Sequence, residues 1–455
     1  MHKITYKQSS LALYKFQNDL NEPDLDFLEN IYSDRENLKK VIAQVISQVL
    51  KTSADRPFEG VIEAGQKIVL KPNWVLEMKL EHEAFCLTTQ FNIIYAILEL
   101  VLLEKPRKVV IADSPIQSCC WSKVVTEDVL QEIGKISGRV STEIEVKDWR
   151  RVVMFDGLHP VEMEKPWEDY IVFDLAQNSI LENITSKSHK FRITCYPHTK
   201  LAETHSPGMH KYCIAKDIFD ADCIISIPKA KSHQKTGLTC ALKNFVGVNG
   251  DKNFLPHHRF GGIKAGGDCY PGGSKLRKIS EHFYDKRNKN LTNKFKAKMY
   301  AILGRIFWTA SRPTQYHQLA AGWYGNDTCW RMVHDLNNIV HFGKIDGTLS
   351  DTPVRKVFSF VDGIIAGQGN GPLSPEPLPL GIISFSNNVA LTDLVIAELM
   401  EFDPEKIALV KKSCEAWLEK DFDLSINGKQ SIIKDLSNIA VPAKPAPGWV
   451  GHIEK

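Results

Sequence analysis

The chain has 455 residues, 43% of them hydrophobic and 24% charged, and its net charge at pH 7 is +3. This length is enough for two or three domains with large cores, and the composition is typical of a globular protein. The small net charge excludes a general polyanion binder, so basic residues are informative only where they cluster. Neither a secretory leader nor an apolar run long enough to span a bilayer is found, and we therefore expect a cytoplasmic protein.

The N-terminal third predicts a helical segment followed by strand–helix units. Residues 1–60 are mostly polar with an amphipathic stretch at 34–52, and we interpret them as an N-terminal helical extension. Strands are then expected at 65–75 and 107–115, and helices at 88–105 and 123–137. This alternation predicts a largely parallel sheet, which we assign to a first α/β lobe at 61–205.

Polar residues stand at the ends of these two strands. Ligands of parallel sheets bind at the carboxyl ends of the strands. We therefore predict that four residues here bind a cofactor, namely Lys71, Asn73, Asp113 and Ser114.

A second α/β lobe is predicted at 206–274 and 320–455. Its strands are expected at 222–228, 356–364 and 380–388, and its helices at 236–247, 328–342 and 389–400. The predicted fold class is thus α/β, with two lobes that each hold a largely parallel sheet flanked by helices. The active-site cleft is expected between the lobes.

Residues 275–319 are interpreted as a basic amphipathic insertion. Between 275 and 312, eleven Lys or Arg stand against two acids, and the stretch 296–312 has one apolar face. Such a segment suits a peripheral contact with an anionic membrane surface. A lid or satellite helix packed on the body is the alternative, and it is the preferred interpretation.

A cluster of cations follows the strand at 222–228. Lys229 and Lys231 are expected to crowd the edge of the sheet, and a helix is expected to begin at Thr236 and Gly237. Free N–H groups at a helix N-terminus attract anions, so this segment predicts a phosphate or carboxylate site. Lys229, Lys231, Thr236 and Gly237 are accordingly predicted to bind a cofactor, as is Asn244 further along the chain. It lacks the spacing of a Walker loop. A solvated basic loop is the alternative interpretation.

Histidines and a further lysine extend this cluster. Lys243 lies ten residues after His233 and is followed by Asn244, and a Lys buried there would need a partner or a shifted pKa. The pair His257 and His258 could ligate a metal or act as acid and base, although a surface pair is the alternative. Asp268 is a third candidate metal ligand, and Gly369 and Gly371 are candidates for close backbone approach to a cofactor.

Six segments resemble the bacterial and archaeal family called domain of unknown function 362, from about residue 67 to about residue 404. They are VLKPNWV, IADSP, ADCIISIPKAKSHQKTGLTCALKNFVGVNGDKNFLPHH, YGNDTCWRMVHDLN, VDGIIAGQGNGP and NNVALTD. The resemblance implies an α/β protein of the prokaryotic cytoplasm, without a settled activity. Some relatives carry a ferredoxin-like cluster segment, but the ten cysteines here include no CxxC pair, so reduced thiols and no iron–sulfur cluster are expected on this chain.

A more distant likeness is to the lactate racemase family, which uses a nickel-pincer nucleotide. In that family a His, a cofactor-anchoring Lys and a nickel-ligating His follow one another in the chain. The likeness implies His233 as acid or base, Lys243 as anchor or charge, and His257 or His258 as a metal ligand.

The leading hypothesis is an enzyme that acts on an anionic small molecule by proton abstraction or isomerisation, with His233, Lys243 and His257 as catalytic residues. A divalent metal or a nucleotide-derived cofactor would assist the reaction. The rival hypothesis is a non-catalytic binding protein for a phosphorylated or nucleotide-like ligand, docked on a membrane by residues 275–312. Nucleic acid is not an expected partner, because the basic residues lack an aromatic stacking platform. The sequence predicts no oligomeric state.

Overall fold

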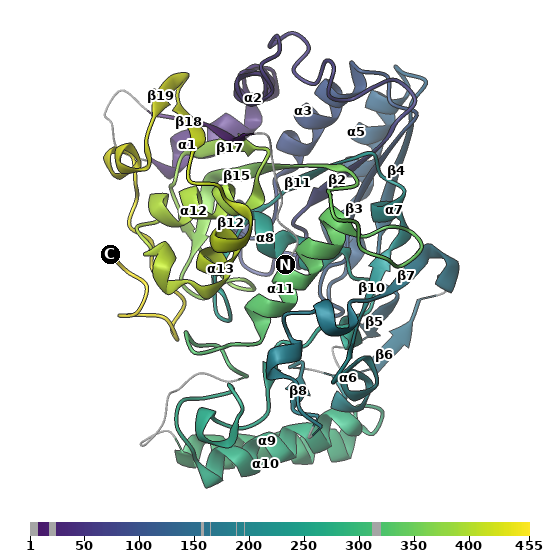
Figure 1. The fold of residues 1–455 in the computed structure, drawn as a ribbon, viewed down its shortest axis with the longest axis vertical. Helices are drawn as coiled ribbons and strands as arrows, with labels where there is room; N and C mark the ends of the chain where they lie inside the picture. The colour runs from purple at the N-terminus through teal and green to yellow at the C-terminus, as the bar shows by residue number, and fades with distance from the viewer. Residues whose placement is uncertain are drawn as a thin grey trace.

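The computed structural model describes residues 8–17, 24–155, 159–163, 165–187, 189–194, 196–311 and 320–455. One twelve-stranded sheet forms its centre, with the main strand order β19-β18-β1-β17-β15-β11-β2-β3-β4 (Figure 1). The strands of this main path are β1 (Ser9–Lys15), β2 (Lys67–Pro72), β3 (Lys108–Asp113), β4 (Glu143–Asp148), β11 (Cys223–Ile227), β15 (Lys356–Gln368), β17 (Ile382–Ser386), β18 (Phe422–Ile426) and β19 (Lys429–Ser431). Three short strands branch from it, namely β12 (Lys229–His233), β13 (Gly237–Thr239) and β16 (Glu376–Leu378).

The five strands from β15 to β4 pair in parallel. Parallel strands are joined by segments that cross over the sheet, and helices in these segments cover both of its faces. Strands β2, β3 and β11 are nearly continuous runs of aliphatic residues, which is the pattern of a parallel sheet covered by helices. Along β2, Val69 packs into the core on one face, while Ile68 and Leu70 pack into the core on the other. The prediction of an α/β fold with a largely parallel sheet is confirmed.

Helices cover both faces of the sheet (Figure 1). On one face lie α1 (Leu25–Ser33), α2 (Arg35–Leu50), α3 (Phe91–Leu102) and α5 (Glu127–Ser137). On the other lie α8 (Ala241–Asn244), α11 (Cys329–Phe342), α12 (Val389–Leu399) and α13 (Ala408–Trp417). Among the described residues, no helix is both long enough and apolar enough to cross a membrane.

The two predicted lobes do not have separate sheets. Strand β11 of the predicted second lobe pairs with β2 of the first, so that Ile225 lies opposite Leu70. Because β11 and β15 then continue the same sheet, the strands of both lobes share one core, and the two-lobe arrangement is not confirmed.

The interpretation of residues 1–60 as a helical extension is wrong in one respect. Residues 9–15 form β1, which lies inside the sheet between β17 and β18. Its Leu11, Ala12 and Leu13 are 1% exposed, because both faces of the strand are covered. The predicted helix at 34–52 is present as α2, whereas residues 1–7 and 18–23 lie outside the described residues.

Shorter elements lie outside this sheet. They are β5 (Val152–Phe155), β6 (His159–Glu162), β7 (Tyr170–Asp174), β8 (Phe191–Arg192), β9 (His205–Ser206), β10 (Met209–Ala215), β14 (His258–Arg259), α4 (Trp121–Val124), α6 (His198–Thr204) and α7 (Lys216–Phe219). The predicted insertion is a pair of helices, α9 (Lys275–Lys289) and α10 (Lys294–Ser311), which pack side by side at the lower edge of Figure 1. Its residues from 312 to 319 lie outside the described part.

The predicted helix at 236–247 is mostly wrong. Strands β12 and β13 form a hairpin there, and α8 begins only at Ala241. Two features make the turn: His233 Nδ1 accepts hydrogen bonds from the backbone N–H groups of Lys235 and Thr236, and Gly237 has a φ of 76°. A residue with a positive φ cannot continue a right-handed helix, and glycine adopts this conformation without a steric penalty.

Candidate functional site

A cavity of about 480 Å³ opens where β2, β3 and β12 end, at the carboxyl edge of the parallel strands. It brings together residues that are far apart in the sequence. The predicted site residues that line it are Lys71, Asn73, Asp113, Ser114, Lys231, His233, Lys243, Asn244 and His257.

The cavity is strongly basic. Lys71, Lys231, Lys235, Lys243 and Lys252 line it, and Asp113 is the only carboxylate among its described lining residues. Burial lowers the pKa of Lys231 and that of Lys252 to about 7. Cations in such surroundings favour an anionic ligand, because its charge would offset their desolvation.

Lys71 and Asp113 form an ion pair at the floor of the cavity. Lys71 Nζ lies 2.7 Å from Asp113 Oδ1, and both side chains are almost fully buried. Asp113 also accepts hydrogen bonds from the backbone N–H groups of Trp74 and Ser114, at 2.7 and 2.8 Å. Burial lowers the pKa of Lys71, and the carboxylate opposes that shift. This lysine is therefore neutralised within the protein.

Lys243 is different, because its ammonium group has no hydrogen bond or ion pair to any described residue. It lies on the short helix α8 and lines the cavity. Burial lowers its pKa, and Cys329, as the second cause, opposes the shift. An ammonium group that is half-buried and unpaired loses part of its hydration, so this position favours a ligand that supplies negative charge.

The two histidines of the cavity present opposite hydrogen-bonding properties. His233 uses Nδ1 as an acceptor, so in its neutral form the proton is on Nε2. His257 Nδ1 lies 2.8 Å from the carbonyl oxygen of Leu255 and donates to it, which leaves Nε2 as the acceptor. Burial holds the pKa of both imidazoles well below the usual range. The pair thus combines a neutral donor with a neutral acceptor.

Lys229 was predicted to bind a cofactor, but it lies in the core instead. Its Nζ is 3.0 Å from Asp362 Oδ1 and donates to the hydroxyl of Tyr32 at 3.0 Å. The register of β12 shifts between Lys229 and Lys231, and an irregularity of this kind re-aims neighbouring side chains. As a result Lys231 lines the cavity, whereas Lys229 is an internal ion-pair residue.

The other predicted cofactor-binding positions in this region serve the fold. Thr236 donates its hydroxyl to the carbonyl of Leu238 within the hairpin, and Gly237 packs against the ring of Trp449. The carbonyl of Gly369 accepts a hydrogen bond from the hydroxyl of Ser232, and a Cβ on Gly371 would lie 2.0 Å from the Ser232 carbonyl oxygen. None of these four lines the cavity as described.

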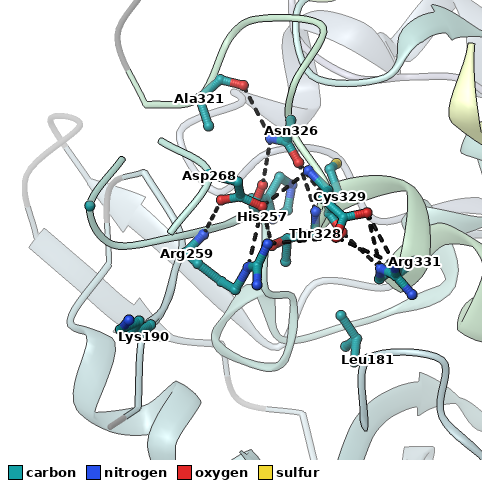
Figure 2. Close-up of polar contacts among 12 residues, drawn as sticks. Leu181, Lys190, His257, Arg259, Asp268, Ala321, Asn326, Thr328, Cys329 and Arg331 are labelled. Atoms are coloured by element: carbon teal, nitrogen blue, oxygen red, sulfur yellow. Dashed lines mark hydrogen bonds and ion pairs between the residues drawn. The ribbon is translucent and has the colours of Figure 1, made fainter. Parts of the chain in front are cut away.

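Asp268 is not oriented as a metal ligand beside His257. Its carboxylate accepts hydrogen bonds from the backbone of Arg259, from the backbone of Asp327 and from the hydroxyl of Thr328 (Figure 2). These donors use the oxygen lone pairs that a metal would need, so Asp268 fixes the start of α11 instead. His258 points to another cluster, with Cys269 and Glu281.

Several lining residues were not predicted as site residues. Lys235 and Lys252 add charge, and Tyr196 donates its hydroxyl to the side chain of Gln117 at the cavity wall. Lys252 donates to the carbonyl oxygen of Ser114 at 2.8 Å. The sequence did hold one signal, because Lys252 stands between the predicted Lys243 and His257 in the chain.

A family model described as Domain of unknown function (DUF362) matches residues 157–398, which is more than half of the chain. The chain belongs to this family. The DUF362 match includes β11 to β13 and the cavity residues Lys231, His233, Lys243 and His257, whereas Lys71 and Asp113 precede it.

Two further proteins are only distantly similar to this chain. The thylakoid-associated protein sll1697 of Synechocystis sp. is 23% identical over 206 residues, which are 45% of this chain and 40% of that protein. The matched part is thus less than half the length of this curated relative. The crystal structure of a Thermotoga maritima protein, determined by the Northeast Structural Genomics Consortium, aligns with 88% of this chain and 60% of its own at 10% identity and a TM-score of 0.32.

Proposed function

We propose that this DUF362 protein is an enzyme that binds an anionic small molecule in the cavity and moves a proton on it. The observation that carries the proposal is Lys243, a half-buried lysine without a counter-charge among the described residues, in a cavity lined by four other lysines and one carboxylate. The anion would supply the missing negative charge. The cavity volume of about 480 Å³ suits a small ligand.

The proton would move between the ligand and the two histidines. His257 Nε2 is an acceptor without a hydrogen bond to any described residue and would act as base, and His233 Nε2–H is a donor in the same situation and would act as acid. Such a pair supports proton abstraction or isomerisation at a carbon that bears oxygen. Lys231 and Lys243 would stabilise the negative charge that develops on that oxygen. The nickel-pincer nucleotide implied by the racemase likeness stays a prediction, as does a divalent metal held by His257.

Ligand binding can be tested first, by thermal unfolding at constant ionic strength with a panel of 2-hydroxycarboxylates, dicarboxylates and sugar phosphates. At least one anion is expected to raise the melting temperature of the wild type but not of Lys243→Met. The variant should fold at least as well as the wild type, because methionine fills the same space without a charge. Lys420→Met is the matched control, because Lys420 is exposed and lies outside the cavity.

Proton transfer can then be tested with the stabilising anion. In D2O, exchange of its carbon-bound hydrogen should be seen by NMR for the wild type and lost in His257→Gln and His233→Gln. These variants should still be stabilised by the anion. Stabilisation by no anion in the panel, or equal stabilisation of Lys243→Met, would reject the anion site, whereas unchanged exchange in both histidine variants would reject the catalytic roles alone.

A second candidate function is peripheral docking on an anionic membrane through α9 and α10. The residues Phe295, Met299, Ile302 and Ile306 recur every three or four positions along α10 and are 80, 38, 53 and 55% exposed. This spacing puts them on one face, and the opposite face, with Ala297, Gly304 and Trp308, is buried against the protein.

Cations flank this apolar stripe. Lys294, Lys296, Lys298 and Arg305 are exposed, and the two acids of the hairpin are engaged within the protein: Asp285 pairs with Arg192 at 3.0 Å, and Glu281 is turned inward. An exposed apolar face between cations is typical of helices that lie in an anionic lipid interface. The name of the Synechocystis relative, thylakoid-associated protein, supports this candidate.

Vesicle co-sedimentation tests the docking. The chain is expected to sediment with vesicles that contain anionic phosphatidylglycerol but not with pure phosphatidylcholine, and high salt should release it. The double variant Ile302→Gln/Ile306→Gln should lose this binding, whereas Ile432→Gln, which changes an isoleucine that is 62% exposed elsewhere, should retain it. Equal binding of all three proteins would contradict a docking role for α10.

A further inference from the structure

A second cluster of chemically active side chains lies beside α9, apart from the residues that line the cavity. His258 of β14, Cys269 of the following loop and Glu281 of α9 each turn one potential ligand atom inward, and these atoms lie within 4.8 Å of one another. His258 and Cys269 are both 6% exposed.

The imidazole of His258 lacks partners for its polar atoms. Neither ring nitrogen makes a hydrogen bond or ion pair with a described residue, and Nδ1 is fully buried. Leaving a buried polar group unsatisfied costs about 1–3 kcal/mol. The other two residues lie together at the local loop: the Cys269 sulfur is within 4.8 Å of a Glu281 oxygen, and both oxygens of Glu281 accept the backbone N–H of Gly261 at 3.1 Å.

The backbone around the cluster is closely packed. A Cβ on Gly267 would lie 2.1 Å from the carbonyl oxygen of Gly261, so only glycine lets the loop fold back on itself. The backbone N–H of Cys269 then donates to that same carbonyl at 3.0 Å. Glu281 is held in turn by the N–H of Gly261. The three side chains are therefore brought together by the fold before any ligand binds.

We infer that His258, Cys269 and Glu281 form a binding site for a divalent transition metal of the zinc type. A thiolate, an imidazole and a carboxylate are the ligands that Zn²⁺ takes, and the thiolate disfavours Mg²⁺ and Ca²⁺. Three protein ligands leave a fourth position for water or for an anion. On binding, the Cys269 S–H bond breaks, the thiolate binds the metal, and the proton is released to the solvent. This site is independent of the proposed acid–base function.

The experiment uses the full chain after chelator treatment. Equilibrium dialysis should give one Zn²⁺ per chain, and Co²⁺ should produce the charge-transfer absorption of a cobalt–thiolate bond. Cys269→Ser should abolish that band and weaken Zn²⁺ binding by at least about tenfold, since one ligand is lost. Cys120→Ser, which changes an exposed thiol, is the control and should match the wild type.

Glu281→Gln keeps the hydrogen-bonding shape and serves if Cys269→Ser does not fold, as judged by circular dichroism. It should weaken Zn²⁺ binding but keep the thiolate band at saturating Co²⁺. The proposal fails if no stoichiometric metal binds, if the cobalt–thiolate band persists in Cys269→Ser, or if Glu281→Gln binds Zn²⁺ as tightly as the wild type. Because the variants of the acid–base proposal change other residues, failure of either proposal leaves the other testable.

Discussion

The substitution Asp113→Asn tests whether the ion pair at the floor of the cavity has the energetics of a buried pair. Lys71 and Asp113 lie 2.7 Å apart with side chains 1 and 4% exposed. At that distance the Coulomb attraction is about 6 kcal/mol for an effective dielectric constant of about 20, but about 1.5 kcal/mol in water. Removing one partner of a buried pair typically costs about 3–5 kcal/mol, because the remaining charge is left buried.

A pair of equal length on the surface provides the control. Lys444 and Glu376 also lie 2.7 Å apart, but their side chains are 67 and 54% exposed. Glu376→Gln should therefore cost only about 0–1 kcal/mol. Urea unfolding followed by circular dichroism gives both free energies of unfolding at pH 7. If the two substitutions cost the same, or if Asp113→Asn costs less than about 1 kcal/mol, the reasoning from burial is refuted.

Three further predictions concern the cavity and its surroundings. Gly247→Ala should destabilise the fold in urea at least as much as Asp113→Asn, because its Cβ would lie 2.0 Å from Asp113 Oδ1; a neutral effect would contradict this packing. The affinity for sulfate, measured by calorimetry, should fall between pH 6 and 9, because Lys231 and Lys252 with pKa values of about 7 lose their protons; a constant affinity would exclude them as ligands. Burial raises the pKa of Asp393 to about 7. The folded state therefore retains a proton that the unfolded chain loses near pH 4. This proton binding stabilises the fold at low pH, and the stabilisation is lost as the pH rises from about 4 to 7. The free energy of unfolding should therefore fall more between pH 5 and 8 in the wild type than in Asp393→Asn, and equal falls would contradict the shift.

The site residues that could be predicted best from the sequence are those at the ends of the strands. The aliphatic runs of β2 and β3 identify parallel strands, and the carboxyl ends of such strands meet at one edge of the sheet. This is why Lys71 and Asp113 could be expected together. The order of His233, Lys243 and His257 was also informative, since all three line the cavity.

Other features depended on geometry that a single sequence does not reveal. Lys229 and Lys231 stand two residues apart and would share a face of a regular strand, but the shift in register separates them. Strand β1 has only seven residues, and it is stabilised by β17 and β18 from the far end of the chain. Cys269 and Glu281 meet only because a glycine loop folds back onto α9.

The presence or absence of a carboxylate partner distinguishes structural lysines of this chain from the lysine to which we assign a function. Lys71 and Lys229 are both buried, and each has a carboxylate within 3.0 Å, as a fold requires when it removes a charge from water. Lys243 is half-buried where it lines the cavity, and it has no such carboxylate among the described residues. A purely structural position would be filled more stably by an aliphatic side chain. The missing negative charge is therefore expected to arrive with a ligand, and Lys243→Met should gain stability in the absence of that ligand and lose it, relative to the wild type, in its presence.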